Sequence, residues 1–272
     1  MTIIIGKNSN LSQSLCSSIA ECYAVSSVNT LKEIETLDID PCEKINIIFN
    51  NFQKSSLLNN LNHPSEYIQR SIMTTSEVLN YIKEKQISIN KIIYTSSSSV
   101  YGNNIFCSEK DILMPMNLHA SIKIANEKLI ETFCIQHDID YTICRIFNMY
   151  GGDDEFSIIS KVINSVKLNT KLTLFNNGNA IRDFIHIDNI VEIYKKILTI
   201  TNIPILNIGT SNGVSIKSII DILIANGYVV DYQTYKKDEL KTSTSNNELL
   251  KQILVDIQLI DIYRYVLTKV GK

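Results

Sequence analysis

The sequence predicts an α/β fold built on a doubly wound parallel sheet, with a smaller C-terminal α/β lobe. Two short runs, Thr2–Ile5 (TIII) and Ile45–Phe49 (INIIF), are almost wholly apolar, as expected for strands buried on both faces of a parallel sheet. Between them, Leu11, Leu15 and Ile19 recur at helical spacing. Strands that alternate with helices in this way form parallel sheets covered by helices.

The same alternation continues along the chain, regularly in the first half and less regularly in the second. We expect the sheet domain to span residues 1–150 and the smaller lobe to span 151–272, with segments of the lobe returning to the first domain. Further predicted strands are Tyr23–Val28, a strand beginning at Lys91–Tyr94, Tyr141–Phe147, Leu172–Phe175 and Ile205–Ile208. Predicted helices are Ser65–Lys85, Leu118–Gln136, Phe156–Val166, Ile187–Thr199 and Ile216–Ala225 with Ser215 as its cap, and Lys236–Asn247 is predicted to be a polar loop.

Composition and charge exclude several classes of protein. Of the 272 residues, 44% are hydrophobic and 20% are charged, which is ordinary for a globular protein. The 26 basic and 28 acidic residues are interspersed, so no basic block predicts a nucleic-acid partner. No apolar run approaches the roughly 18 residues of a membrane span. The N-terminus has no signal-peptide pattern, and the expected location is cytoplasmic.

Cysteines and histidines give no sign of a metal site. The six cysteines have irregular spacings without a CxxC pair, and the four histidines also lack metal-ligand spacing. Most cysteines lie within apolar patterns, where a free thiol behaves as a small hydrophobic group. We therefore expect reduced thiols rather than disulfides, and no bound metal.

The turn after the first strand is the first candidate binding site. In dinucleotide-binding folds, glycines at this turn let the backbone approach a pyrophosphate at a helix N-terminus. Here the spacing of GxxGxxG survives, but only Gly6 remains, with Ser9 and Ser12 at the other two positions. The Cβ of serine makes a left-handed backbone costlier, although its hydroxyl can contact phosphate. A plain strand–turn–helix and a cofactor turn made by Gly6, Ser9, Asn10, Leu11 and Ser12 both stay open.

The end of the second strand usually carries an acid that binds the adenosine ribose of NAD. This chain has Ser26, Ser27 and Asn29 there, followed by Lys32, with neither a carboxylate nor an arginine in place. The choice between NAD and NADP therefore stays open, and so does whether a cofactor binds at all.

Three later segments are more specific, and they occur in a fixed order. They are YTSSSSVYG at Tyr94–Gly102, RIFNMYGG at Arg145–Gly152 and IRDFIHIDNIV at Ile181–Val191. Together they closely resemble the extended short-chain dehydrogenase/reductase family, whose NAD-dependent epimerases and dehydratases modify nucleotide sugars. The GKNSNLS turn is most similar to the dTDP-4-dehydrorhamnose reductase branch of that family.

The resemblance implies a Rossmann-type dinucleotide-binding domain in residues 1–150 and a substrate-binding lobe in 151–272. It also implies NAD or NADP as cofactor, a nucleotide sugar as substrate and surface-polysaccharide precursor synthesis as the setting. Many relatives dimerise through two long helices, which here match Ser65–Lys85 and Leu118–Gln136, so a homodimer is possible.

The resemblance assigns roles to four matching residues. Ser97 would hydrogen-bond the reacting oxygen, and Phe147 would pack beside the nicotinamide. Asn148 and Arg182 would contact the diphosphate of the sugar nucleotide, for which a guanidinium is a suitable donor. Two structural readings stay open beside these roles: the serines at 96–99 could simply solvate a strand end, and Arg182 could form a salt bridge with Asp183 or Asp188.

Two positions argue against one reaction of the family. Sugar 4,6-dehydratases carry an Asp-Glu pair where this chain has Ser98 and Ser99. Serines cannot supply and remove protons as carboxyl groups do, so dehydration is disfavoured.

The family's catalytic pair is Tyr-x-x-x-Lys, one helical turn apart and therefore on one face. Lys123 matches the lysine, which binds the nicotinamide ribose and lowers the pKa of the tyrosine. His119 stands in place of the tyrosine, and the flanking Ala120, Ser121 and Glu127 fit the family pattern. Three explanations stay open: His119 acts as the acid/base, the protein binds a nucleotide sugar without turnover, or His119 only fills the space.

Two functions follow from these residues. The first is an NAD(P)-dependent nucleotide-sugar epimerase or keto-reductase that uses Ser97, His119 and Lys123. The alternative is a catalytically impaired member of the family that binds a nucleotide sugar or a dinucleotide in a regulatory role.

Overall fold

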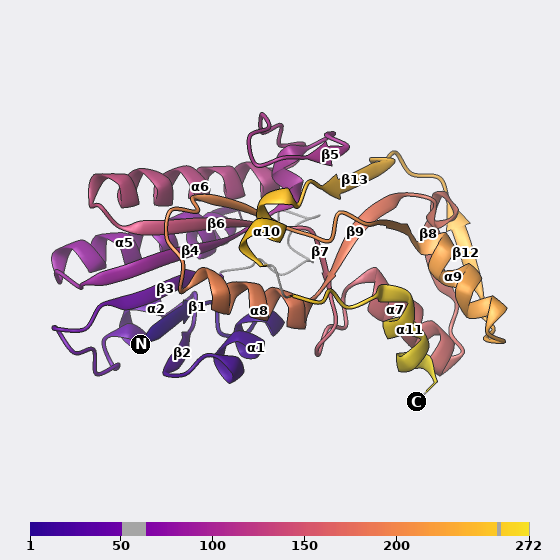
Figure 1. Ribbon diagram of the computed structural model, residues 1–272, viewed down its shortest axis with the longest axis horizontal. Helices are drawn as coiled ribbons and strands as arrows, with labels where there is room; N and C mark the ends of the chain where they lie inside the picture. Colours follow the sequence, from indigo (N-terminus) through magenta and orange to yellow (C-terminus); the bar gives the residue numbers. More distant parts are fainter. Residues whose placement is uncertain (51–63, 255–256, 272) are drawn as a thin grey trace. The chain divides into compact units, whose positions relative to one another are not determined.

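The computed structural model describes residues 1–50, 64–254 and 257–271, and it confirms the predicted α/β class with a Rossmann-like parallel sheet (Figure 1). The chain divides into two compact units, each built from segments distant in sequence. The first contains Met1–Gly102, Ile112–Arg145 and Val191–Leu206, and the second contains Asn103–Asp111, Ile146–Ile190 and Asn207–Lys272. The predicted functional division at residue 150 stays a prediction.

A six-stranded sheet with the strand order β10-β6-β4-β3-β1-β2 forms the centre of the first unit. Strand β1 pairs in parallel with both β2 and β3, and β3 pairs in parallel with β4. The predicted strands TIII, INIIF and Ile205–Ile208 are confirmed to the residue. The strands are β1 (Thr2–Ile5), β2 (Cys22–Val25), β3 (Ile45–Phe49), β4 (Ile89–Ser97), β6 (Asp140–Ile146) and β10 (Ile205–Ile208).

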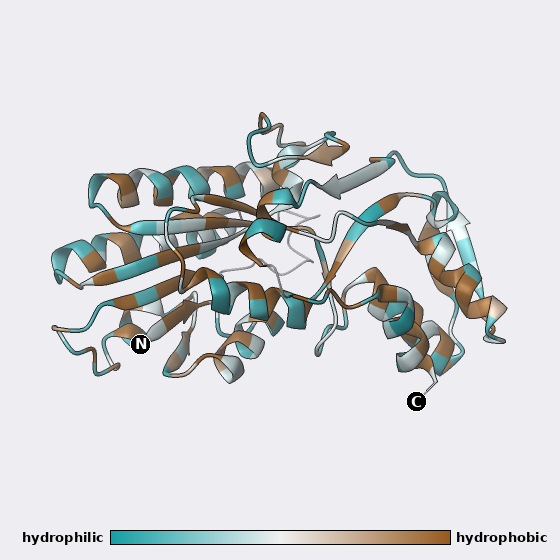
Figure 2. Cartoon of the chain, in the orientation of Figure 1, coloured by the Kyte–Doolittle hydropathy of each residue, from teal (hydrophilic) through white to brown (hydrophobic). Residues whose placement is uncertain are grey.

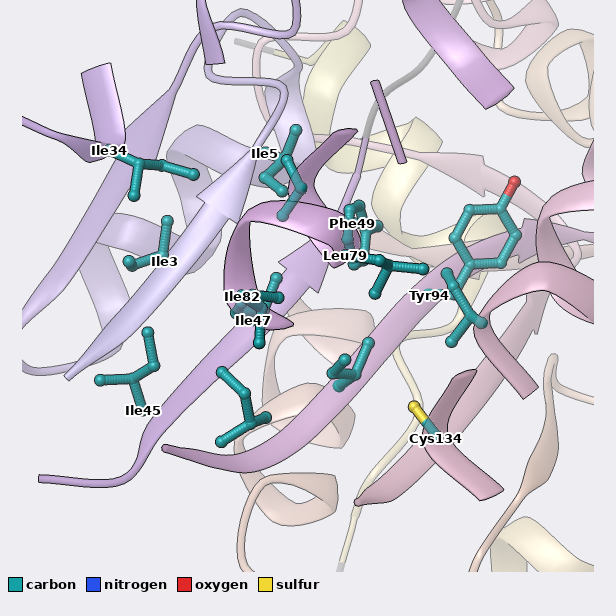
Figure 3. Packing of buried hydrophobic residues seen from close by; sticks show 14 of the residues in the cluster. Ile3, Ile5, Ile34, Ile45, Ile47, Phe49, Leu79, Ile82, Tyr94 and Cys134 are labelled. Atoms are coloured by element: carbon teal, nitrogen blue, oxygen red, sulfur yellow. The ribbon is translucent and has the colours of Figure 1, made fainter. Parts of the chain in front are cut away.

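Both faces of this sheet are buried, which explains the apolar runs. On one face Ile3, Ile47 and Ile92 pack with apolar residues of α5 and α6 in one core cluster (Figure 3). On the other face Ile4 and Ile48 are fully buried, and α1 and α8 lie on this side of the sheet (Figure 1). Helix bounds are α1 (Asn10–Ser18), α2 (Thr30–Ile34), α5 (Thr74–Glu84), α6 (Leu118–Gln136) and α8 (Ile187–Ile197), and the 3₁₀ turn η2 spans Ser98–Tyr101.

Helix α6 has the predicted bounds, and Figure 2 shows hydrophilic and hydrophobic residues alternating along it. The helix predicted at Ser65–Lys85 is present but not uniform. It consists of α4 (Pro64–Ile68), the π-helical turn η1 (Gln69–Met73) and α5. A π turn changes the angular offset between the side chains before and after it, which a 3.6-residue pattern does not register.

The second unit has two smaller sheets. One has the order β11-β9-β13-β5, with β7 also paired to β9, and the other pairs β12 with β8. The loop predicted at Lys236–Asn247 is partly wrong, because it contains strand β13. The strands are β5 (Phe106–Cys107), β7 (Asn148–Tyr150), β8 (Leu172–Phe175), β9 (Ile181–His186), β11 (Gly213–Ser215), β12 (Tyr232–Tyr235) and β13 (Thr242–Ser245). The helices are α7 (Ile158–Leu168), α9 (Ile216–Ala225), α10 (Glu248–Ile253) and α11 (Ile262–Val270), and the 3₁₀ turn η3 spans Asn176–Gly178.

A buried carboxylate joins three segments of this second unit. Asp183 on β9 is fully buried and accepts hydrogen bonds from both the backbone N–H and the hydroxyl of Thr210, at 2.8 and 2.6 Å. Its other oxygen accepts from the N–H of Ser211 at 2.9 Å and from the N–H and hydroxyl of Ser245 at 3.0 and 2.6 Å. Five donors therefore stabilise a charge that burial alone would disfavour.

The cysteines follow the predicted pattern in part. Cys107, Cys134 and Cys144 are buried, whereas Cys42 is exposed. The thiols of Cys16 and Cys22 form a hydrogen-bonded pair 2.8 Å apart. Within the described ranges, no helix is both long and apolar enough to span a bilayer.

We predict that Asp183→Asn lowers the free energy of unfolding by roughly 3 kcal/mol, because the new amide N–H₂ would face donors that now bond a carboxylate. Urea unfolding measures the change. Asp188→Asn, two residues after the end of β9 with a side chain that is 70% exposed, is the matched control and should change the free energy by less than about 0.5 kcal/mol. Equal effects of the two substitutions would contradict the role given to Asp183.

Candidate active site

The first unit brings Lys123 of α6 to the carboxyl end of β4, the strand that carries Ser97. Helix α6 begins after Asn117, whose side chain accepts the N–H of Ala120 at 2.9 Å. His119 and Lys123 are four positions apart, which places both on one face of the helix. The Lys123 ammonium donates to the carbonyl oxygen of Thr95 at 2.8 Å and is only 4% exposed.

Ser97 itself ends β4 and caps the short turn η2. Its hydroxyl oxygen accepts the N–H of Ser99 at 3.2 Å. This capping bond is one of the structural roles expected of serines at a strand end, and it leaves the hydroxyl hydrogen available to a further acceptor. The catalytic role of Ser97 stays a prediction.

A buried ion pair fixes the position of α6 against the sheet. The Arg145 guanidinium on β6 bonds the Glu127 carboxylate of α6, with a shortest distance of 2.7 Å and both side chains 3% exposed. The Ser96 hydroxyl donates to the same carboxylate, and Arg145 donates to the hydroxyl of Tyr101 at 3.0 Å. Glu127 lies one turn after Lys123, so this cluster also sets where Lys123 meets β4.

His119 is held in its neutral form. Burial, and then the charge of Lys123, lower the pKa of His119 from 6.5 to about 4. The hydroxyl of Tyr67, on α4, lies 3.4 Å from Nδ1 of the His119 ring. Tyr67 is 2% exposed, whereas His119 remains partly exposed.

The pKa of Lys123 is also lowered, which favours the uncharged amine. Burial lowers its pKa from 10.5 to about 7, while the negative charge of Glu127 opposes the shift. A lysine with a pKa near neutrality changes charge readily, which is a frequent property of functional sites.

The turn after β1 has the shape of a cofactor turn with its serines already hydrogen-bonded. Gly6 has φ of +110°, which a residue with a side chain would adopt only with strain. The Ser9 hydroxyl oxygen accepts the N–H of Ser12 and so caps α1. The Asn50 amide donates to both serine hydroxyls, at 2.8 and 2.7 Å. Leu11, which follows at the start of α1, is fully buried in the core.

The prediction that no carboxylate stands at the end of β2 is wrong. Glu33 of α2 reaches that point and accepts the N–H of Ser26 at 2.9 Å, while it bonds the Lys7 ammonium at 2.9 Å. Lys7 and then the Ser26 N–H lower the pKa of Glu33, so the carboxylate is charged at neutral pH. The acid was missed because it comes from the following helix, not from the strand end itself.

These residues fit a dinucleotide. Gly6 allows close approach to the N-terminus of α1, where N–H groups and the helix dipole favour phosphate, although Ser9 occupies one of those N–H groups. Glu33 stands where an adenosine ribose is usually bound. The buried Asn50 Oδ1 accepts no hydrogen bond from the described residues.

The second unit contains the residues predicted to contact the sugar nucleotide. Asn148 on β7 donates to the carbonyl of Asp183 at 3.0 Å, and Phe147 is buried beside it. The structural alternative kept open for Arg182, a salt bridge with Asp183 or Asp188, is wrong in its partner. Arg182 pairs instead with Glu239 at 3.4 Å, because the Asp183 carboxylate is already bound by its five donors.

Three residues that shape these clusters, Glu33, Asn50 and Tyr67, carried no sequence signal of their own. Glu33 and Asn50 lie outside any recognised motif, and Tyr67 meets His119 only through tertiary packing across 52 residues. The buried pairing of Arg145 with Glu127 is the exception that could have been found. Arg145 lies in the apolar segment TICRIF, where a buried charge requires a partner.

Comparison with known proteins then assigns the chain to a family. The model of the NAD dependent epimerase/dehydratase family matches residues 9–209. The chain belongs to this family. The resemblance and fold class predicted from the sequence are thereby confirmed, and the predicted nicotinamide cofactor is confirmed as that of the family.

Relatives and solved structures agree with this membership. Protein CapI of Staphylococcus aureus is 27% identical over 161 residues, which are 57% of this chain and 47% of CapI. The chain thus spans about half of that relative. UDP-glucuronate 4-epimerase of Thermodesulfobacterium geofontis is 25% identical over 84% of this chain and 76% of its own length. The UDP-glucuronic acid 4-epimerase of Bacillus cereus, solved with UDP-glucuronic acid and NAD, matches the fold with a TM-score of 0.82 at 19% identity, covering 100% of this chain and 98% of its own.

We predict that His119 titrates with a pKa of about 4 and that Lys123→Met raises this value toward 6.5, because the cation is removed. The unfolded chain binds more protons at this ring between pH 4 and 6.5, so His119 makes stability rise with pH across that window. Proton NMR of the imidazole signals measures the pKa. Lys128→Met, on the exposed side of α6, is the control and should leave it unchanged. A value near 6.5 in the unmodified protein would contradict the electrostatic account.

Proposed function

We propose that the chain is an NAD-dependent enzyme that epimerises or reduces a sugar linked to a nucleotide, with surface-polysaccharide precursor synthesis as its setting. The observation that carries this proposal is the pairing of His119 and Lys123 on one face of α6, with Lys123 bonded to the end of the strand that carries Ser97. Membership of the family and the matching folds of epimerases support it.

We assign the cofactor to the first unit, through Gly6, Ser9, Asn10, Leu11 and Ser12 at the turn. Lys123 would hold the nicotinamide ribose, and Phe147 would lie beside the nicotinamide. NAD, when bound, supplies the group that accepts or returns a hydride. The Glu33 carboxylate favours NAD over NADP in this proposal, because its charge would repel a phosphate on the ribose.

We assign the nucleotide sugar to Asn148 and Arg182 of the second unit. The Arg182 guanidinium is partly exposed, and its pairing with Glu239 at 3.4 Å is longer than a strong charge-assisted hydrogen bond. A diphosphate with two charged oxygens would therefore replace Glu239 as its partner. Asn148 supplies an amide that can bind the same group once its bond to the Asp183 carbonyl rearranges.

In the reaction, His119 would exchange the proton of the reacting sugar oxygen and Ser97 would hold that oxygen by a hydrogen bond. Burial, and then the positive charge of Lys123, lower the pKa of His119 and so keep its ring free of an extra proton. Ser98 and Ser99, as the next two residues, provide no carboxyl group to move protons at neighbouring carbons. Epimerisation or reduction is therefore favoured over dehydration.

One observation favours the alternative, a binding protein without turnover. The Ser9 hydroxyl already occupies an N–H at the start of α1, and Asn50 holds both serines of the turn. This turn has lost the two glycines that allow close contact with a pyrophosphate. A protein of this kind would bind a nucleotide sugar or dinucleotide with no need for a catalytic His119.

We predict that the purified protein converts a nucleotide-linked sugar with NAD, or reduces a keto sugar with NADH, and does neither with NADP or NADPH. His119→Gln should lower kcat by at least about a hundredfold, as loss of a general acid/base does. NMR of the sugar products, over a panel of UDP- and dTDP-linked substrates, measures turnover. His137→Gln, at the far end of α6, is the matched control and should retain full activity.

The two functions give different results in this assay. Binding of NAD and a nucleotide sugar without any product would favour the regulatory alternative. Turnover that is unaffected by His119→Gln would retain the enzyme but reject His119 as its acid/base.

A further inference from the structure

Tyr67 meets the residue that replaces the family tyrosine, although the two are 52 positions apart. Its hydroxyl lies 3.4 Å from Nδ1 of His119, and its side chain is 2% exposed. Tyr67 stands on α4, in the helical run that continues into α5, and α5 lies beside α6 on the same face of the sheet (Figure 1). A second aromatic hydroxyl is therefore built into the surroundings of the candidate acid/base.

The helix around Tyr67 is irregular at this point. The π turn η1 begins at Gln69, two residues after Tyr67, and packs against α6. Such turns cost stability and are frequent near functional sites. Tyr67 therefore lies in α4 directly before this irregular turn, and α5 follows it.

The chemistry of the two groups decides which one donates the hydrogen bond. Burial raises the pKa of Tyr67, so its hydroxyl keeps its proton, and His119 is neutral at pH 7. A neutral imidazole has one N–H and one nitrogen lone pair, and that lone pair is far more basic than a phenol oxygen. The favourable arrangement is therefore O–H of Tyr67 donating to Nδ1 of His119.

We propose that Tyr67 is a positioning residue that fixes His119 as the tautomer with its proton on Nε2. Which nitrogen of a histidine carries the proton is set by the hydrogen bond that the other nitrogen makes. The ring then presents an N–H donor to the substrate. The Tyr67–His119 pair thus offers the substrate one hydrogen-bond donor, as a single tyrosine does in the family.

The tautomer of His119 also indicates the class of substrate, an inference that rests on the proposed function. An N–H donor suits an oxygen that only accepts hydrogen bonds, and a neutral imidazole can polarise a carbonyl in this way. The protein in this tautomer would therefore bind a keto sugar, through a hydrogen bond from His119 Nε2–H to the carbonyl oxygen. Among the proposed reactions, it favours keto-reduction, in which a reduced nicotinamide would give its hydride to the carbonyl carbon, Nε2–H would polarise the carbonyl oxygen, and water would supply the proton that this oxygen takes up.

The tautomer can be measured without any substrate, by long-range ¹H–¹⁵N correlation spectra of the ¹⁵N-labelled full chain at pH 7. The chain has four histidines, so the spectrum of His119→Gln identifies the His119 signals. We expect the Nε2–H form to dominate at His119. Tyr67→Phe should lower the ratio of the two tautomers by about fivefold, as loss of one hydrogen bond does. Tyr81→Phe, on α5, is the matched control and should leave the ratio unchanged.

Two results would overturn the proposal. One is an Nδ1–H form that dominates in the unmodified protein, and the other is a ratio unchanged by Tyr67→Phe in a variant whose circular dichroism shows it to be folded. Because the spectra need no turnover, they separate this proposal from the proposed function. An inactive protein with the Nε2–H form would reject only the function, and an active protein with the Nδ1–H form would reject only the role of Tyr67.

Discussion

The buried ion pair between Glu127 and Arg145 is the interaction on which the candidate site of the first unit depends. Both side chains are 3% exposed, so each charge needs the other to offset the loss of water. The pair joins α6 to β6, and the Ser96 hydroxyl joins it to β4. Lys123 keeps its place at the end of β4, bonded to the Thr95 carbonyl, because the helix cannot slide or rotate without separating these charges.

The electrostatics of the site are compatible with our prediction that His119 stands where the family has tyrosine. A nearby cation favours whichever form carries less positive charge, so the matching lysine favours a phenolate in the family. Here burial, and then Lys123, favour a neutral imidazole at His119. The same lysine therefore keeps either residue able to accept a proton. The two residues differ before substrate binds. A phenolate only accepts hydrogen bonds, whereas a neutral imidazole has one donor and one acceptor nitrogen, and its neighbours decide which of the two carries the proton.

The sequence predicted the regular parts of the fold because local pattern determines them. The strands TIII and INIIF follow from burial on both sheet faces, and α6 agrees to the residue because its cap and apolar spacing coincide. Strand β13 (TSTS) was missed because its stability comes from pairing with β9 and β5, not from apolar residues. Glu33, Asn50 and Tyr67 could not be found either, because each acts through a contact with a residue distant in sequence or outside its own motif.

The central claim is that this chain, with His119 in place of tyrosine, still transfers hydride between a nicotinamide and a sugar. The most direct measurement mixes the protein and NAD, in equal amounts, with a nucleotide sugar and follows the near-ultraviolet absorbance of the reduced nicotinamide during one turnover. For a substrate that is oxidised in the first step, the account predicts a rise in that absorbance, and for a keto sugar supplied with NADH it predicts a fall. Binding of both ligands, shown by calorimetry, with no absorbance change in either direction would contradict it.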